Sequence, residues 1–64
     1  MFWTYVIRSD EGHRYIGQTG DLEQRLQDHN SGRNHATKHG HNWVLIHSEM
    51  LSTRSEAMRR EKWL

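Results

Sequence analysis

Apolar residues occur along this chain in short runs, and the spacing within each run predicts a secondary-structure element. Two runs, Phe2 to Arg8 and His13 to Gln18, are rich in aromatic and β-branched residues, and the sequence between them is Ser-Asp-Glu-Gly. Strand-forming runs separated by turn formers predict a β-hairpin. A third run, Trp43 to Met50, begins with four consecutive large apolar residues and predicts a third strand.

Capping residues and helical spacing predict two helices. Asp21 is followed three positions later by Gln24, a pair that is typical of a helix N-terminus, and this helix is expected to end near Ser31. A last helix is expected to begin after Ser52 or Thr53. The predicted order is ββαβα, and these elements can share one core only if the helices pack against a small sheet. We therefore predict an α+β fold, arranged as an α/β sandwich.

The length and composition limit the class of protein. The 64 residues predict a single domain, 1–64, with a thin core, because a chain of this size buries only about 60% of its unfolded surface. The absence of cysteine excludes disulfide partners and thiolate metal sites. The apolar runs are far shorter than the roughly 20 residues of a membrane helix, and no signal-peptide pattern is present. We expect a soluble, cytoplasmic protein with no membrane partner.

Charge is unevenly distributed, although the net charge is only +1. The segment from Asn30 to His41 contains no acidic residue, and the last segment is also rich in arginine. The basic residues of these two zones are Arg33, His35, Lys38, His39 and His41, followed by Arg54, Arg59, Arg60 and Lys62. Two such zones can follow a phosphate backbone, but a solvated charged face is the commoner meaning of this pattern.

Polar residues also lie on the apolar side of the first predicted helix. At 100° per residue, Arg25 and His29 fall beside Leu22 and Leu26. Either each polar side chain extends past the leucines to solvent, or both point toward a common partner.

The last predicted helix places a carboxylate among apolar residues. Glu61 lies between Ala57, Met58 and Leu64 on the helical projection. An unpaired buried carboxylate costs several kcal/mol, so a cation, a metal ion or hydrogen-bond donors are expected opposite it. The alternatives are an ordinary ion pair to an arginine, Arg25 or Arg54, or exposure of Glu61 at a frayed helix end.

The register of the hairpin decides whether its tyrosines lie together. Tyr5 and Tyr15 share a face only if the numbers of paired residues have an even sum. If that sum is 22, Tyr5 lies opposite Gly17, and the glycine would leave a hollow for a water or a phosphate oxygen. An odd sum would separate the two phenols, which would then be ordinary tyrosines at the edge of the core.

Five of these features occur in an order that resembles the GIY-YIG nuclease family over nearly the whole chain. The matching features are Tyr5, Tyr15-Ile16-Gly17, Arg25 with His29 four residues later, and a Ser-Glu-Ala-Met-Arg-Arg-Glu helix that contains Glu61. The first half of the signature survives as Trp3-Thr4-Tyr5. The sequence from Asp21 to Gly32 is similar to that of small, stand-alone, single-domain members.

The resemblance implies a three-stranded antiparallel sheet flanked by helices, and metal-dependent endonuclease hydrolysis of DNA phosphodiesters. Mg²⁺ is the expected cofactor, with Mn²⁺ as an alternative. We expect selection by DNA structure rather than sequence, as in DNA repair or recombination. The resemblance also implies that the last helix normally continues, whereas this sequence ends at Leu64, one turn after Glu61. We therefore expect either that the chain is inactive or that 1–64 is truncated at its C-terminal end.

The resemblance also suggests chemical roles for the matched residues. Arg25 is expected to bind phosphate oxygens and stabilise the transition state, and Glu61 to be the sole protein ligand of the metal. Tyr5 is the expected general base and Tyr15 is expected to orient the water or contact the phosphate, although the reverse assignment is open. A phenol ionises near pH 10, so a neighbouring cation is expected to lower its pKa. His29 either takes the proton or holds a phosphate.

The basic loop has two interpretations. Arg33, His35 and Lys38 are expected to bind nucleic acid. The rival interpretation is a zinc site formed by His35, His39 and His41, which the lack of a neighbouring acidic or cysteine residue in the sequence disfavours.

Two further hypotheses compete with a nuclease. One is a non-catalytic nucleic-acid-binding module of the same fold, which would have no Mg²⁺-dependent cleavage to lose when Glu61 is changed. The other is a purely structural domain, in which Arg25 affects stability but not DNA affinity. For either type of DNA-binding domain we expect a monomer or weak dimer, with target specificity supplied by another protein.

Overall fold

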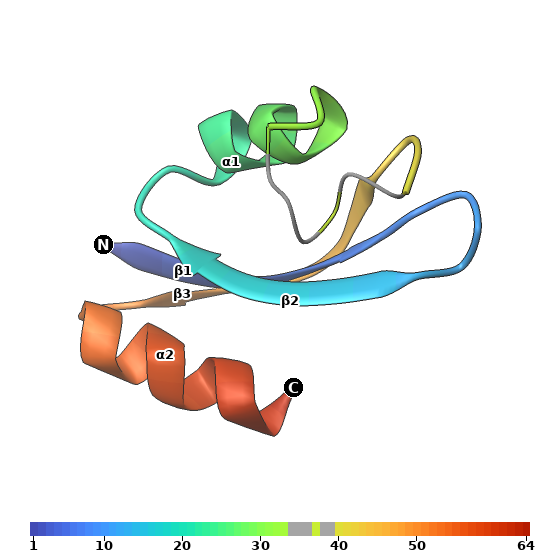
Figure 1. Ribbon diagram of the computed structural model, residues 1–64. Helices are drawn as coiled ribbons and strands as arrows, with labels where there is room; N and C mark the ends of the chain where they lie inside the picture. The colour runs from blue at the N-terminus through green and yellow to red at the C-terminus, as the bar shows by residue number, and fades with distance from the viewer. Residues whose placement is uncertain (34–36, 38–39) are drawn as a thin grey trace.

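The computed structural model confirms the predicted order of elements and describes every residue except 34–36 and 38–39. The chain forms a three-stranded antiparallel sheet between two helices (Figure 1). The elements are β1 (Phe2–Arg8), β2 (Arg14–Thr19), α1 (Leu22–Asn30), β3 (Val44–Leu51) and α2 (Arg54–Trp63). No helix among the described residues is long and apolar enough to cross a bilayer.

The sheet has the order β2-β1-β3, so β1 is the central strand, and its side chains point alternately toward the two helices. α1 covers one face and α2 covers the other (Figure 1). On the α1 face, Tyr5 and Ile7 form the core with Trp43, and Leu22 and Leu26 pack against them. Trp43 was expected to begin the third strand, but it lies just before β3 and is buried.

The α2 face holds a second, smaller set of buried residues. Thr4 and Val6 point toward α2 from β1, and Ala57 is the buried residue of the helix. The Thr4 hydroxyl donates a 2.7 Å hydrogen bond to the Ala57 carbonyl oxygen. Met58 was expected on the apolar side of this helix, but it is half exposed, because Ala57 already occupies the narrow contact with the sheet.

Both predicted N-caps are present. The Asp21 carboxylate accepts the Gln24 N–H at 3.1 Å, although the Gln24 side chain bonds to Asp28 rather than reaching back to the cap. In α2, Thr53 accepts the Glu56 N–H and donates its hydroxyl to the Glu56 carboxylate. These bonds satisfy backbone donors that the first turn of a helix leaves without partners.

A pair of hydrogen bonds connects the end of α1 to the start of β3. The Asn30 side-chain amide donates to the Trp43 carbonyl oxygen at 3.0 Å and accepts the Trp43 N–H at 2.7 Å. Asn30 therefore binds the Trp43 backbone as a neighbouring strand would. The Trp43 indole N–H donates to the Thr37 carbonyl oxygen at 3.0 Å, which attaches the intervening loop to the core.

The first hairpin turn is joined to the end of the same loop. The Glu11 carboxylate accepts from the His41 N–H and lies 2.7 Å from His41 Nδ1. The Asn42 side chain donates to the Asp10 carboxylate at 2.6 Å. The hydrogen bonds from His41, chiefly the one from its side chain, lower the pKa of Glu11 to about 2. The sequence predicts no acidic residue near His41, and this prediction is wrong because the fold brings Glu11 into contact with it.

The outer strand β3 leaves apolar side chains uncovered. Its register against β1 shifts between Val6 and Ile7, which leaves one additional residue in β3. Val44, Leu45, Ile46 and Met50 are all more than one-third exposed. The apolar start of this run therefore predicts a strand correctly, but of its four residues only Trp43, which precedes β3, joins the main core.

The hairpin register places Tyr5 opposite Gly17, with Tyr15 on the same face. An ideal Cβ on Gly17 would lie 2.6 Å from Tyr5 Oη and 2.9 Å from Tyr15 Cε1. The expected hollow beside Gly17 is therefore filled by the Tyr5 phenol itself. Gly17 is required here because any side chain would overlap the two tyrosines.

Gly17→Ala is expected to lower the free energy of unfolding by about 1–3 kcal/mol, because the added methyl group overpacks a buried site. Urea denaturation of the wild type and of the variant measures this change. Gly20→Ala is the matched control, since its Cβ would meet Phe2 at 3.7 Å, an ordinary contact distance. Equal destabilisation by the two substitutions would contradict this account of Gly17.

Candidate active site

A chain of hydrogen bonds runs through the core on the α1 face. Tyr5 Oη lies 2.8 Å from His29 Nε2, and His29 Nδ1 lies 2.7 Å from Thr37 Oγ1. Tyr5 is 2% exposed, and His29 and Thr37 are each 1% exposed. His29 therefore points into the core rather than past the leucines to solvent.

Three rings pack around this chain. The Tyr15 ring centroid lies 4.9 Å from that of His29 and 6.3 Å from that of Tyr5, in tilted arrangements. Tyr15 is only partly buried. The site thus contains one enclosed phenol bonded to an imidazole and one phenol that is accessible to solvent.

The environment keeps both titratable partners neutral. Burial raises the pKa of Tyr5, Tyr15 and Glu61 raise it further, and the Arg25 charge opposes them. Burial also lowers the pKa of His29, as does the Arg25 charge. Arg25 lowers the pKa of Tyr5, as expected of a neighbouring cation, but desolvation of the phenol is the larger effect, so the pKa is raised on balance.

Arg25 and Glu61 both act on Tyr5, although they come from helices on opposite faces of the sheet. The two charges shift the pKa of the phenol in opposite directions. The sheet separates the helices by only one layer, and β2 forms its edge beside Tyr5 (Figure 1). Both side chains are partly buried. The phenol is therefore within electrostatic reach of both.

Glu61 does not form the ordinary ion pair that was its alternative interpretation. Among the described residues it has no ion pair and accepts no hydrogen bond, and Arg54 instead lies 5.0 Å from the centre of the Phe2 ring. The same residues contain no cluster of three histidine, cysteine or acidic side chains. Any metal at Glu61 would therefore depend on water and substrate for most of its ligands.

The predicted nucleic-acid-binding residues are only partly described. Arg33 is exposed, and its guanidinium lies 3.7 Å from the Asp28 carboxylate. His35 and Lys38 lie outside the described residues, as does His39 of the alternative zinc site. His41 bonds to Glu11 at the hairpin turn.

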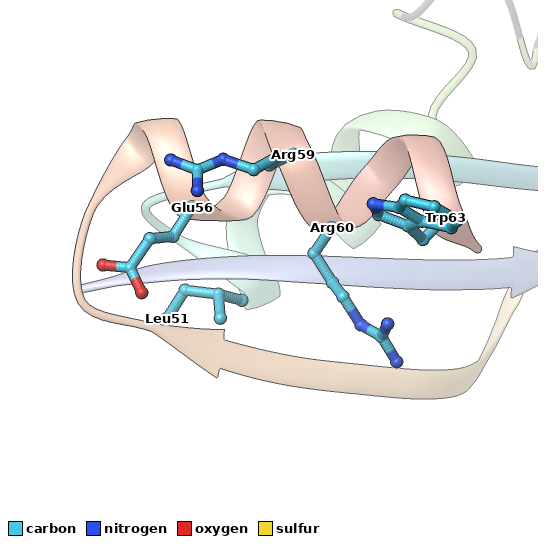
Figure 2. Close-up of a pocket in the computed structure, with 5 residues that line it drawn as sticks. All are labelled: Leu51, Glu56, Arg59, Arg60 and Trp63. Atoms are coloured by element: carbon cyan, nitrogen blue, oxygen red, sulfur yellow. The ribbon is translucent and has the colours of Figure 1, made fainter.

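A surface groove beside α2 is separate from these residues. It has a volume of about 230 Å³ and is lined by Leu51, Glu56, Arg59, Arg60 and Trp63 (Figure 2). Arg60 projects from α2 toward β3 and donates two hydrogen bonds to Glu49, at 2.6 and 3.0 Å. These bonds lower the pKa of Glu49 to about 2. None of the predicted catalytic residues lines this groove.

Comparison with known proteins decides the family. The whole chain, residues 1–64, matches the family described as the GIY-YIG catalytic domain. The chain is a GIY-YIG protein. Membership places it in a nuclease family and confirms the resemblance carried by Tyr5, Tyr15-Ile16-Gly17, Arg25, His29 and Glu61.

Similar GIY-YIG relatives are small proteins. A UPF0213 protein of Staphylococcus haemolyticus is 38% identical over 60 residues, which cover 92% of this chain and 73% of the relative. A UPF0213 protein of Halobacterium salinarum is 39% identical over 62 residues, covering 95% and 80%. The solution NMR structure of a UPF0213 protein from Bacillus halodurans has a TM-score of 0.57 at 28% identity, covering 98% of this chain and 69% of that one.

Sequence reasoning did not find Thr37. It is buried in the core of this GIY-YIG domain, where it bonds to His29 through its side chain and to Trp43 through its carbonyl oxygen. Thr37 lies eight residues after His29 in a polar loop without periodicity. No local pattern distinguishes it from its neighbours, because its burial depends on how the loop returns to β3.

The buried neutral His29 predicts a loss of stability in mild acid. Its pKa is lower in the folded than in the unfolded state, so the unfolded state binds more protons as the pH falls below about 6.5. The free energy of unfolding is therefore expected to fall from this pH downward, to the lowered pKa of the folded state. Urea denaturation between pH 8 and 5 measures the effect.

His29→Gln is expected to reduce this pH dependence, since an amide can still bond to Tyr5 but does not titrate in this range. His13→Gln, at an exposed position, is the control and should keep the wild-type dependence. An unchanged slope in the His29 variant would show that another group is responsible.

Proposed function

We propose that this GIY-YIG domain is a metal-dependent endonuclease that hydrolyses DNA phosphodiester bonds. The observation that carries the proposal is the buried hydrogen bond between Tyr5 and His29, with Arg25 and Glu61 both acting on the same phenol. A neutral phenol hydrogen-bonded to a neutral imidazole can pass a proton to it, and two opposite charges lie within electrostatic reach of the phenol. Strongly shifted pKa values in such a cluster are typical of catalytic sites.

The Tyr5–His29 pair solves the difficulty of using a phenol as a base. A free phenolate is scarce at neutral pH, and burial of Tyr5 makes it scarcer. If the Tyr5 hydroxyl donates to His29 Nε2, then Tyr5 can accept a proton from the attacking water as its own proton passes to the imidazole. The neutral state of His29 provides the acceptor nitrogen. Tyr5 never needs to ionise before the reaction.

Tyr15 and Arg25 complete the phosphate side of the site. Tyr15 is on the same face, is more exposed, and can orient the water or contact a phosphate oxygen. The Arg25 guanidinium remains charged at any working pH and can bind two phosphate oxygens together. Charge that develops on the phosphate in the transition state would be stabilised most strongly by such a donor in a partly buried position.

The donor set fits a weakly held Mg²⁺ or Mn²⁺ at Glu61. The carboxylate is partly buried and has no other partner among the described residues. Mg²⁺ keeps several waters and commonly takes one or two carboxylates with substrate oxygens. Bound at Glu61, the ion would supply positive charge for the departing oxygen. We expect selection by DNA structure, as in repair, because the described site has no element that could read bases.

Cleavage assays test the proposed activity. The protein is incubated with supercoiled plasmid and with flap and branched DNA, with Mg²⁺, with Mn²⁺ or with EDTA. We expect nicking only with metal. Glu61→Gln is expected to abolish it while DNA binding remains, and Arg25→Ala to lower the rate by about 10²–10³. Glu23→Gln and Arg59→Ala, both at exposed positions, are the controls.

The outcomes separate the rival functions. Metal-dependent nicking that both site variants retain would assign the activity to another site or a contaminant. Binding without nicking by the wild-type protein would support the non-catalytic binding module. Neither binding nor nicking would exclude both.

Tyr5→Phe tests the proposed proton transfer. It is expected to lower the cleavage rate by about 10²–10⁴, because His29 then has no hydroxyl through which to accept the proton. Tyr15→Phe is expected to have a smaller effect, since it removes an orienting contact only. Single-turnover rates with a branched substrate, measured from pH 6 to 9.5, compare the two variants. A larger loss for Tyr15→Phe would reverse the two roles.

A further inference from the structure

Two arginines face each other at the far end of the β1–β2 hairpin. Arg8 and Arg14 are direct partners in the strand register and both are exposed. Directly opposed residues share a face, and alternation along β1 from Thr4 and Val6 places this pair on the α2 face. They are not among the residues of the candidate active site.

This pair lacks the usual compensation for like charge. Like charges directly opposite each other in an antiparallel sheet are destabilising. Neither Arg8 nor Arg14 forms an ion pair with any residue in the described part of the chain. The hairpin end thus presents two exposed arginines at paired strand positions, neither with an ion-pair partner among the described residues.

The two acidic residues nearest in sequence are already bound elsewhere. Glu11 accepts two hydrogen bonds from His41, and Asp10 accepts one from Asn42. The low pKa of Glu11 results chiefly from the hydrogen bonds with His41. The turn therefore holds its carboxylates against the loop and leaves the arginines available for an external anion.

The pair lies in line with the helix that carries Glu61. α2 runs in the same direction as β1 (Figure 1), with Arg54 against Phe2 and Ala57 bonded to Thr4. The four helical residues from Ala57 to Glu61 advance about 6 Å and two strand residues about 7 Å, so Glu61 lies near the level of Val6. Arg8 follows about 7 Å further along the strand.

We propose that Arg8 and Arg14 together form a phosphate clamp that binds the DNA backbone on the α2 face, beyond Glu61. This inference rests on the proposed function and adds a binding surface to it. Two planar guanidinium groups suit the oxygens of one phosphodiester, or of two successive ones, and they bind it without regard to base sequence. The clamp holds the strand past Glu61 and gives the domain affinity without sequence specificity.

Binding at several salt concentrations tests the clamp. Fluorescence anisotropy with a labelled DNA duplex in EDTA, which prevents cleavage, gives the slope of log K against log salt. In the double variant Arg8→Gln/Arg14→Gln this slope is expected to fall by about 1.8, since each lost phosphate contact contributes about 0.9. Arg59→Gln/Lys62→Gln removes two charges from the outer side of α2 and should change the slope less.

Thermal stability gives an independent readout. Without DNA, the double Gln variant is expected to have a higher Tm than the wild type, because the like-charge repulsion is gone. With saturating DNA this order should reverse. Arg8→Lys/Arg14→Lys keeps both charges and should keep most of the salt dependence. A variant that gains stability and loses DNA affinity cannot have lost affinity through unfolding.

The outcomes distinguish this inference from the proposed function. If the wild type binds and cuts DNA but the double Gln variant has an unchanged slope, the clamp is overturned and the nuclease remains. If the wild type binds with the expected difference in slope but never cuts, the clamp stands and the catalytic proposal fails. If the wild type does not bind DNA, both are overturned.

Discussion

The hydrogen-bonded chain from Tyr5 through His29 to Thr37 is the interaction on which the rest of the molecule depends. Three polar side chains, all almost completely buried, satisfy one another in a core that contains few large apolar residues. A neutral imidazole offers one donor and one acceptor, which hydroxyls on both sides can match. The imidazole of His29 thus joins the central strand, the first helix and the loop.

The same residues determine both the packing of the core and the protonation of Tyr5. The phenol fits across the sheet only because its partner on β2 is Gly17, and its burial keeps it protonated. The sheet is a single layer, so charges from helices on its two faces can both act on that phenol. A thicker core would have placed one of these two charges farther from the phenol. The small size of the domain is therefore compatible with the site and even favours it.

The sequence predicted the elements well because their signals are local. The cap residues Asp21 and Thr53 and the turn formers between the first two strands each act within a few positions. The pairing of Tyr5 with Gly17 could be predicted only by assuming one register of the hairpin, and the register itself depends on how the sheet packs against the helices. The burial of Thr37, the partner of His41 and the direction of the Tyr5 pKa shift depend on contacts distant in sequence, which no local pattern encodes.

The two hydrogen bonds between the Asn30 side chain and the Trp43 backbone have a consequence for how such domains can diversify. They close the base of the connection between α1 and β3, while Asp10 and Glu11 hold the two residues that precede Trp43. With its ends anchored to the scaffold and Thr37 kept in the core, the remainder of the connection could be exchanged or lengthened during evolution with little disturbance of the strands, because lengthening a closed loop costs little additional entropy. Relatives of this fold could therefore acquire new substrate preferences by changing this connection alone.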